Sequence, residues 1–98
     1  MLLLYDLPVL TARQRHAAYH FRKKLISLGF SQLQESVYIL LVHNDSMTAS
    51  EISKIKKFVP KEGTVQVLPI SLNVFQGLQT LTGEPYNHSL FSDDFVVL

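Results

Sequence analysis

The spacing of hydrophobic residues predicts the order of elements in the first third of the chain. Met1–Asp6 is an apolar run that stops before a Leu-Pro turn, as a buried strand does. Apolar residues then recur at helical spacing up to Gly29, which predicts a helix with one core-facing stripe. Thr11 and Gln14 fit a capping box at the start of this helix. The stripe consists of Ala18, Phe21, Leu25 and Leu28.

Three further strands and a short helix are predicted downstream. The strands are Phe30–Gln34, Val37–Val42 and Thr64–Ile70. Because Val37–Val42 is nearly all apolar, we expect both of its faces to be covered. Ser71–Leu81 is expected to contain the short helix, and Phe95–Leu98 to form one more strand.

A second long helix is predicted between the third and fourth strands. Thr48 and Glu51 have the spacing of a capping box, and Met47 and Ile52 occupy the two staple positions. Pro60 prevents this helix from continuing. The residues expected to face the core are Ile52, Ile55 and Val59.

The resulting order, β-α-β-β-α-β with an extra C-terminal strand, predicts a single α+β domain of the ferredoxin-like type over residues 1–98. In this fold both helices cover one face of an antiparallel sheet and leave the other face open. An apolar third strand would then be exposed to water. The simplest cover is the same sheet of a second copy, so we expect a homodimer.

The composition indicates that a partner covers part of the surface, and it excludes sites that need cysteine. Charged residues make up 17 % of the chain, against roughly 25 % in a typical domain. Cysteine is absent, which excludes disulfides and thiolate metal sites. The opening apolar run is too short to span a membrane and follows no basic segment, so we expect no membrane association and a cytoplasmic location.

The nine basic residues fall into two groups. They are Arg13, Arg15, Arg22, Lys23 and Lys24 in the first group, and Lys54, Lys56, Lys57 and Lys61 in the second. The first group contains no acidic residue. Such blocks are either solvated helix faces or the footprint of a nucleic-acid backbone, and the charge pattern alone leaves both alternatives open.

Asp6 is the one acidic residue among the first 34 and ends the first strand. Its carboxylate is expected to hydrogen-bond the backbone of the following turn, as Asp commonly does. The alternative depends on the dimer. Two Asp6 carboxylates that approach across a two-fold axis would need a shared proton or a cation such as Mg²⁺ between them.

Other candidate sites have weaker support. His16 and His20 are four residues apart and could share a metal ion, but no HExxH motif surrounds them, so exposed histidines are favoured. His43 and His88 have no partner at metal-ligand spacing. The third strand lacks the Lys/Arg-Gly-Phe pattern with which RNA-binding versions of this fold stack bases.

Five short motifs stand along the chain in an order typical of one known family. They are Tyr5–Pro8, Phe21–Leu25, Gly29–Phe30, Leu33–Tyr38 and Gly63–Leu68. Together they resemble the small CRISPR-associated proteins called Cas2, and the resemblance covers nearly the whole chain. The C-terminal Gly83-Glu84 and Phe95–Leu98 are most similar to members from type II loci.

The resemblance implies a homodimer of ferredoxin-like protomers in which residues 83–98 pack on the partner protomer. It implies a role in spacer acquisition, where the dimer binds duplex DNA and bridges dimers of the CRISPR integrase subunit. Many members are described as metal-dependent nucleases on RNA or DNA. By match to the family, Asp6 would be the catalytic and metal-binding residue, with Mg²⁺ or Mn²⁺ at the dimer two-fold. The residues matched to backbone contacts are Arg13, Arg15, Arg22 and Lys23.

Three functions are therefore expected, in descending order. The first is a non-catalytic adaptor, the second a Mg²⁺-dependent endonuclease or endoribonuclease that uses paired Asp6 residues, and the third a toxin-type endoribonuclease of the same fold. The adaptor ranks first because one carboxylate per chain is few for metal catalysis. In addition, Leu7-Pro8 replaces the more polar loop of many family members, which would narrow access to Asp6.

Overall fold

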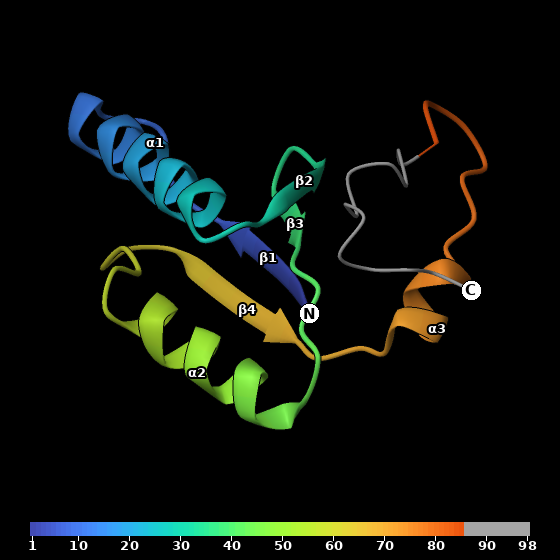
Figure 1. The fold of residues 1–98 in the computed structure, drawn as a ribbon. Coiled ribbons are helices and arrows are strands. Elements are labelled where there is room, and N and C mark those ends of the chain that lie inside the picture. The colour runs from blue at the N-terminus through green and yellow to red at the C-terminus, as the bar shows by residue number, and fades with distance from the viewer. Residues whose placement is uncertain (86–98) are drawn as a thin grey trace.

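Four strands form one sheet in the order β2-β3-β1-β4, and every neighbouring pair is antiparallel. The computed structural model describes residues 1–85 (Figure 1). The elements are β1 (Leu2–Asp6), α1 (Ala12–Ser27), β2 (Ser31–Gln34), β3 (Val37–Ile39), α2 (Asp45–Lys56), β4 (Thr64–Leu68) and α3 (Leu72–Gln76). This order and topology confirm the ferredoxin-like α+β fold.

The main core lies between one face of the sheet and the two long helices. Leu3 of β1 pairs with Tyr38 of β3, and both side chains are fully buried. Phe21 and Leu25 of α1 and Ile55 of α2 belong to the same hydrophobic cluster. Because α1 and α2 bury their apolar stripes against the same strands, the opposite face of the sheet is left without a helix from either of them (Figure 1).

The opposite face of the sheet is apolar at its centre and exposed in part. Successive residues of a strand point to opposite faces, so Leu2 and Leu4 lie on the face away from Leu3. Leu4 is 38 % exposed, and Leu68, which pairs with Leu2 from β4, is 53 % exposed. Ile39 is buried on this face, and it lines one cavity together with Phe75 of the short helix α3.

The third strand is shorter than predicted, because its neighbour ends. β3 stops at Ile39 rather than at Val42. The Leu40 N–H donates to the carbonyl of Met1, and the N-terminal amine donates to the carbonyl of Leu40. Beyond Met1 no residue of β1 remains to pair with. The apolar Leu40 and Val42 instead pack on the core from partly buried positions.

The fourth strand also stops early, because β1 has no residue before Leu2 to pair with it. Its last residue is Leu68, paired with Leu2, rather than the predicted Ile70. Pro69 follows directly and has no N–H to continue a ladder.

Helix α2 begins three residues before the predicted start. Asn44 is the N-cap, and its Oδ1 accepts from the Met47 N–H at 2.9 Å. The predicted cap, Thr48, lies inside the helix, and its hydroxyl donates to the Asn44 carbonyl. Toward the end of the segment, the predicted core residue Val59 is exposed and Phe58 packs on the core instead.

Helix α1 begins and ends as predicted. The capping box is complete: the Thr11 hydroxyl accepts from the Gln14 N–H, and the Gln14 side chain accepts from the Thr11 N–H. Gly29 follows the C-cap with φ of 101°, a conformation that favours glycine. The short helix predicted within Ser71–Leu81 is α3, capped by the Ser71 hydroxyl. The predicted strand Phe95–Leu98 lies outside the described residues.

Candidate nucleic-acid interface and carboxylate site

Asp6 lies at the end of β1, opposite Thr64 of β4. Tyr5 packs on the helix-covered core, so Asp6 lies on the other face of the sheet, together with Leu4. Its side chain is exposed and makes no hydrogen bond or ion pair within residues 1–85. The expected hydrogen bond from this carboxylate to the following turn is therefore not formed among those residues. The carboxylate faces solvent.

The backbone at Asp6 lies against Gly63, the first residue of the Gly63–Leu68 motif. Gly63 has φ of 90°, in the left-handed region. A Cβ at this position would lie 2.5 Å from the Asp6 carbonyl oxygen and 2.9 Å from the Leu7 side chain. Only glycine fits there without a shift. The start of β4 thus packs directly on the end of β1 and fixes the position from which the carboxylate projects.

The Mg²⁺ or Mn²⁺ site expected at the dimer two-fold takes one Asp6 from each protomer, and one protomer shows its own share of it. Within residues 1–85 no three His, Cys, Asp or Glu side chains gather where they could hold a metal ion. Mg²⁺ in proteins is held by one or two carboxylates, with water and substrate oxygens completing the octahedron. Asp6 supplies one carboxylate, so a second ligand would have to come from another copy.

Arg13 is an exposed cation at the start of α1. It lies in the first turn and is exposed, and it lines a groove of about 270 Å³ together with Pro60 and Lys61. The nearby Glu62 accepts from the Gln14 side chain at 3.1 Å. Among the described residues, the Arg13 guanidinium has no hydrogen-bond or ion-pair partner. Its charge, beside the positive end of the helix dipole, is available to an anion.

Arg15 and Arg22 are held by neutral acceptors. The Nη1 atom of Arg15 donates to the carbonyls of Val9 and Leu10, both at 3.2 Å. The Nε atom of Arg22 donates to the hydroxyl of the buried Tyr38 at 3.0 Å. A carbonyl or a hydroxyl orients a guanidinium without cancelling its charge. Both arginines therefore keep their positive charge and have further N–H groups free to bind phosphate.

The anchor of Arg22 belongs to an aromatic stack under α1. Tyr38 stacks on Tyr5 with ring centroids 5.8 Å apart, and Tyr5 meets Phe21 edge to face at 5.5 Å. Burial raises the pKa of Tyr5 to about 12, and the neighbouring Tyr38 hydroxyl adds to the shift. Tyr5 is therefore neutral near neutral pH and does not compensate the Arg22 charge.

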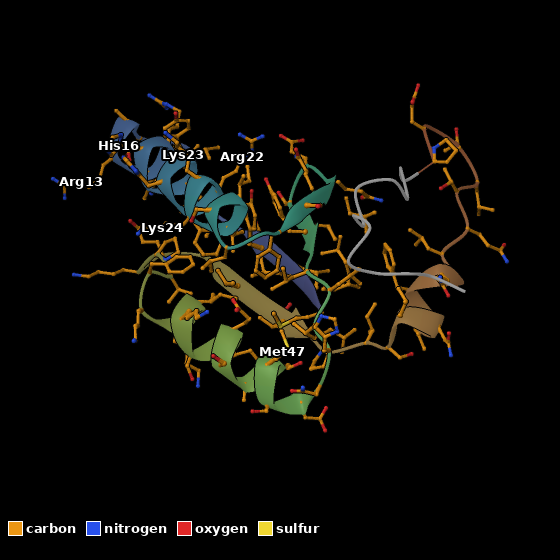
Figure 2. The ribbon with its side chains drawn as sticks, viewed as in Figure 1. Arg13, His16, Arg22, Lys23, Lys24 and Met47 are labelled. Carbon is orange, nitrogen blue, oxygen red and sulfur yellow. The ribbon has the colours of Figure 1, made fainter. Side chains whose placement is uncertain are left out.

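The basic residues of α1 point to several sides of the helix rather than to one. Residues two apart in a helix point to nearly opposite sides, which separates Arg13 from Arg15. Arg22 follows Arg15 by two turns and shares its side, whereas Lys24 follows Arg13 by three turns and shares that side. Lys23 lies over the Tyr19 ring, 5.2 Å from its centroid. Figure 2 shows Arg22 and Lys23 on the side of α1 away from α2, and Lys24 on the nearer side.

The histidines within residues 1–85 are exposed, as expected for His16 and His20, and His88 lies outside the described residues. His16 and His20 lie on one side of α1 with their Nε2 atoms 2.9 Å apart, and His43 is exposed before α2. No helix within residues 1–85 has the length and apolar character needed to cross a membrane.

These features define a class: a small ferredoxin-like α+β protein with an acid-free basic helix and an exposed carboxylate at the end of its first strand. A sequence model of the family described as CRISPR associated protein Cas2 matches residues 1–77. The match covers more than half of the chain and includes β1 and α1. The chain belongs to the Cas2 family.

Curated relatives agree with this assignment. A protein of Treponema denticola is 36 % identical over 98 residues, which cover all of this chain and 97 % of the relative. A protein of Streptococcus mutans is 38 % identical over 84 residues, or 86 % of this chain and 78 % of the relative. A protein of Ligilactobacillus salivarius is 32 % identical over 84 residues, 86 % of this chain and 83 % of the relative. Each of these relatives is named CRISPR-associated endoribonuclease Cas2.

Proposed function

We propose that the protein is a nucleic-acid-binding scaffold of CRISPR adaptation, which holds duplex DNA by its backbone and bridges dimers of the integrase subunit. The observation that carries this proposal is the charge of α1. The helix has five Lys or Arg residues and no acid, and none of the hydrogen bonds made by its arginines goes to a carboxylate. Phosphate contacts of this kind position a duplex without reading its sequence.

The scaffold acts as a homodimer in this proposal. The face of the sheet away from α1 and α2 presents Leu4 and Leu68 in part to solvent. A second copy that covers this face would remove that apolar surface from water. The two copies of α1 would then double the number of cations that one duplex meets.

A binding assay tests the scaffold. Size-exclusion chromatography of the protein with the integrase subunit of its locus and a short DNA duplex is expected to give one co-migrating complex. Two duplexes of unrelated sequence are expected to bind equally well, because phosphates carry no sequence information. Asp6→Asn is expected to enter the same complex. A chain that binds neither the duplex nor the integrase subunit would contradict the proposal.

A second candidate is the endoribonuclease activity that the relatives' names carry, with Asp6 as its catalytic residue. Its support is the exposed carboxylate, held by the contact of Gly63 with the end of β1. Asp6 from each of two copies would together hold a Mg²⁺ or Mn²⁺ ion. When bound, such an ion supplies charge stabilisation and a polarised water. In this candidate the role of each chain is to place one ionised carboxylate at the dimer axis.

An RNA-cleavage assay tests this second function separately. Cleavage is expected to require Mg²⁺ or Mn²⁺, to stop on addition of a chelator, and to be lost in Asp6→Asn. Asp45→Asn, at the start of α2, is the matched control and is expected to keep full activity. Cleavage that survives in a rigorously purified Asp6→Asn sample would remove Asp6 from the mechanism and leave the scaffold proposal unaffected.

A further inference from the structure

Helix α1 carries two histidines whose side chains meet. His16 and His20 are four residues apart, so they lie one turn apart on the same side of the helix. Their Nε2 atoms are 2.9 Å apart, and their ring centroids are separated by 4.2 Å. Both side chains are exposed, and Figure 2 shows His16 beside Arg13 near the start of α1, away from the sheet.

We propose that His16 and His20 form a two-histidine site for a transition-metal ion such as Cu²⁺, Ni²⁺ or Zn²⁺, separate from Asp6. An imidazole nitrogen binds such ions at about 2.0–2.1 Å, so two of them at a right angle around one ion lie about 3 Å apart. The observed distance of 2.9 Å between the two Nε2 atoms matches this arrangement. The remaining coordination positions face solvent and take water.

An ion that binds both rings displaces the proton that they share, and this proton stays on its own ring. In the contact between the rings, the Nε2–H of one histidine donates to the Nε2 of the other, and the tautomers decide which ring is the donor. A metal ion needs both Nε2 lone pairs. The proton between the rings therefore moves to the Nδ1 atom of its own ring, and the rings turn so that both lone pairs point at an ion beside the line that joins the two nitrogens.

The surroundings of the pair select the kind of ion. Arg13 precedes His16 by three residues, and Lys23 and Lys24 follow His20 by three and four, so cations flank the site on both sides along the helix. No acidic residue lies in α1 to supply an oxygen ligand. Mg²⁺ and Ca²⁺ require oxygen ligands, whereas imidazole suits copper, nickel and zinc. Cu²⁺ is expected to bind most tightly, following the Irving–Williams order.

A calorimetric titration tests the site. The full chain, in a buffer that does not bind metals, is titrated with the chlorides of Cu²⁺, Ni²⁺, Zn²⁺ and Mg²⁺. The expected result is one Cu²⁺ ion per chain at the histidine pair, weaker binding of Ni²⁺ and Zn²⁺ there, and no Mg²⁺ binding that depends on His16 or His20. His16→Gln and His20→Gln are each expected to weaken Cu²⁺ binding by about 100-fold, because each leaves a single imidazole where two act together.

Control variants make the result decisive. His43→Gln and Asp45→Asn leave the pair intact and are expected to bind Cu²⁺ as the wild type does. The bound ion joins two successive turns of α1, so Cu²⁺ is expected to raise the Tm of the wild type but not of His16→Gln. Circular dichroism checks that each variant is folded. Cu²⁺ binding that is unchanged in folded His16→Gln and His20→Gln, or that is lost in His43→Gln, would overturn the proposal.

Discussion

Helices α1 and α2 cover the same face of the sheet but present different charge to solvent. α1 has five Lys or Arg residues and no Asp or Glu, whereas α2 has Lys54 and Lys56 balanced by Asp45 and Glu51. The Lys54 Nζ lies 3.0 Å from a Glu51 carboxylate oxygen. A count of Lys and Arg marks both regions as basic, but α2 has as many acidic as basic residues, whereas the five cations of α1 have no acid on the helix.

The partners of the cations explain why the two helices differ. In α1, Arg15 and Arg22 donate to carbonyls and to a tyrosine hydroxyl, which orient a guanidinium without neutralising it. In α2, Lys54 donates to a carboxylate, and an exposed pair of that kind contributes little to stability. A hydrogen bond to a neutral acceptor thus prepares a cation for an anionic ligand, whereas an ion pair neutralises it.

The largest expected effect comes from the hydrophobic core that α1 and α2 share. Phe21 of α1 and Ile55 of α2 are each 2 % exposed and belong to one core. Phe21→Ala is expected to lower the free energy of unfolding by about 3–5 kcal/mol, and Ile55→Ala by about 2–5 kcal/mol. Urea denaturation at fixed protomer concentration measures both losses, with the exposed Tyr19→Ala as control. If either loss is no larger than that of Tyr19→Ala, that helix does not pack as described.

The next effect concerns where α2 begins. Asn44→Ala removes the side-chain cap and is expected to cost about 1 kcal/mol of stability, as Thr11→Ala is expected to do for α1. Thr48→Ala removes only a hydroxyl donor inside the helix and is expected to cost less. Thermal unfolding of the three variants compares the caps. A larger loss of stability for Thr48→Ala than for Asn44→Ala would show that the helix is capped at Thr48, as the sequence predicted.

A smaller effect concerns the anchored arginine of α1. Tyr38→Phe keeps the buried ring but removes the hydroxyl that accepts from Arg22. The Arg22 side chain is then freer in the unbound protein, and DNA binding has to immobilise it. That ordering costs about 0.5–1.5 kcal/mol, or roughly twofold to tenfold in affinity. Fluorescence anisotropy with a labelled duplex measures the change, with Tyr19→Phe as the control variant. Unchanged affinity in Tyr38→Phe would mean that the anchor does not contribute to binding.

Local signals in the sequence predicted the elements better than their ends. The cap of α1 was readable because Thr11 and Gln14 bond within one turn. At α2 two side chains suited to capping stood close together, and Asn44 forms the cap instead of Thr48. The ends of β3 and β4 depend on where β1 begins, at Leu2, and no local pattern contains that information.

The candidate residues could be picked out from the sequence, and their roles stay predictions, but the contacts around them could not be predicted. Asp6 stood out as a lone acid at a strand end, and the basic group stood out by its lack of acids. The bond between Arg22 and Tyr38 joins residues 16 apart and exists only because α1 lies over β3. The place of Gly63 against the Asp6 carbonyl likewise depends on the pairing of β1 with β4.

The salt dependence of duplex binding tests most directly whether α1, and not α2, is the phosphate-binding helix. The double variants Arg13→Ala/Arg15→Ala and Lys56→Ala/Lys57→Ala remove equal charge from the two regions. Each phosphate contact contributes about −0.9 to the slope of log K against log[salt], so the four arginines of a dimer account for up to roughly −3 to −4, depending on how many of them reach a phosphate. The account predicts that the α1 variant loses this part of the slope and that the α2 variant keeps the wild-type slope. Equal slopes in the two variants would contradict it.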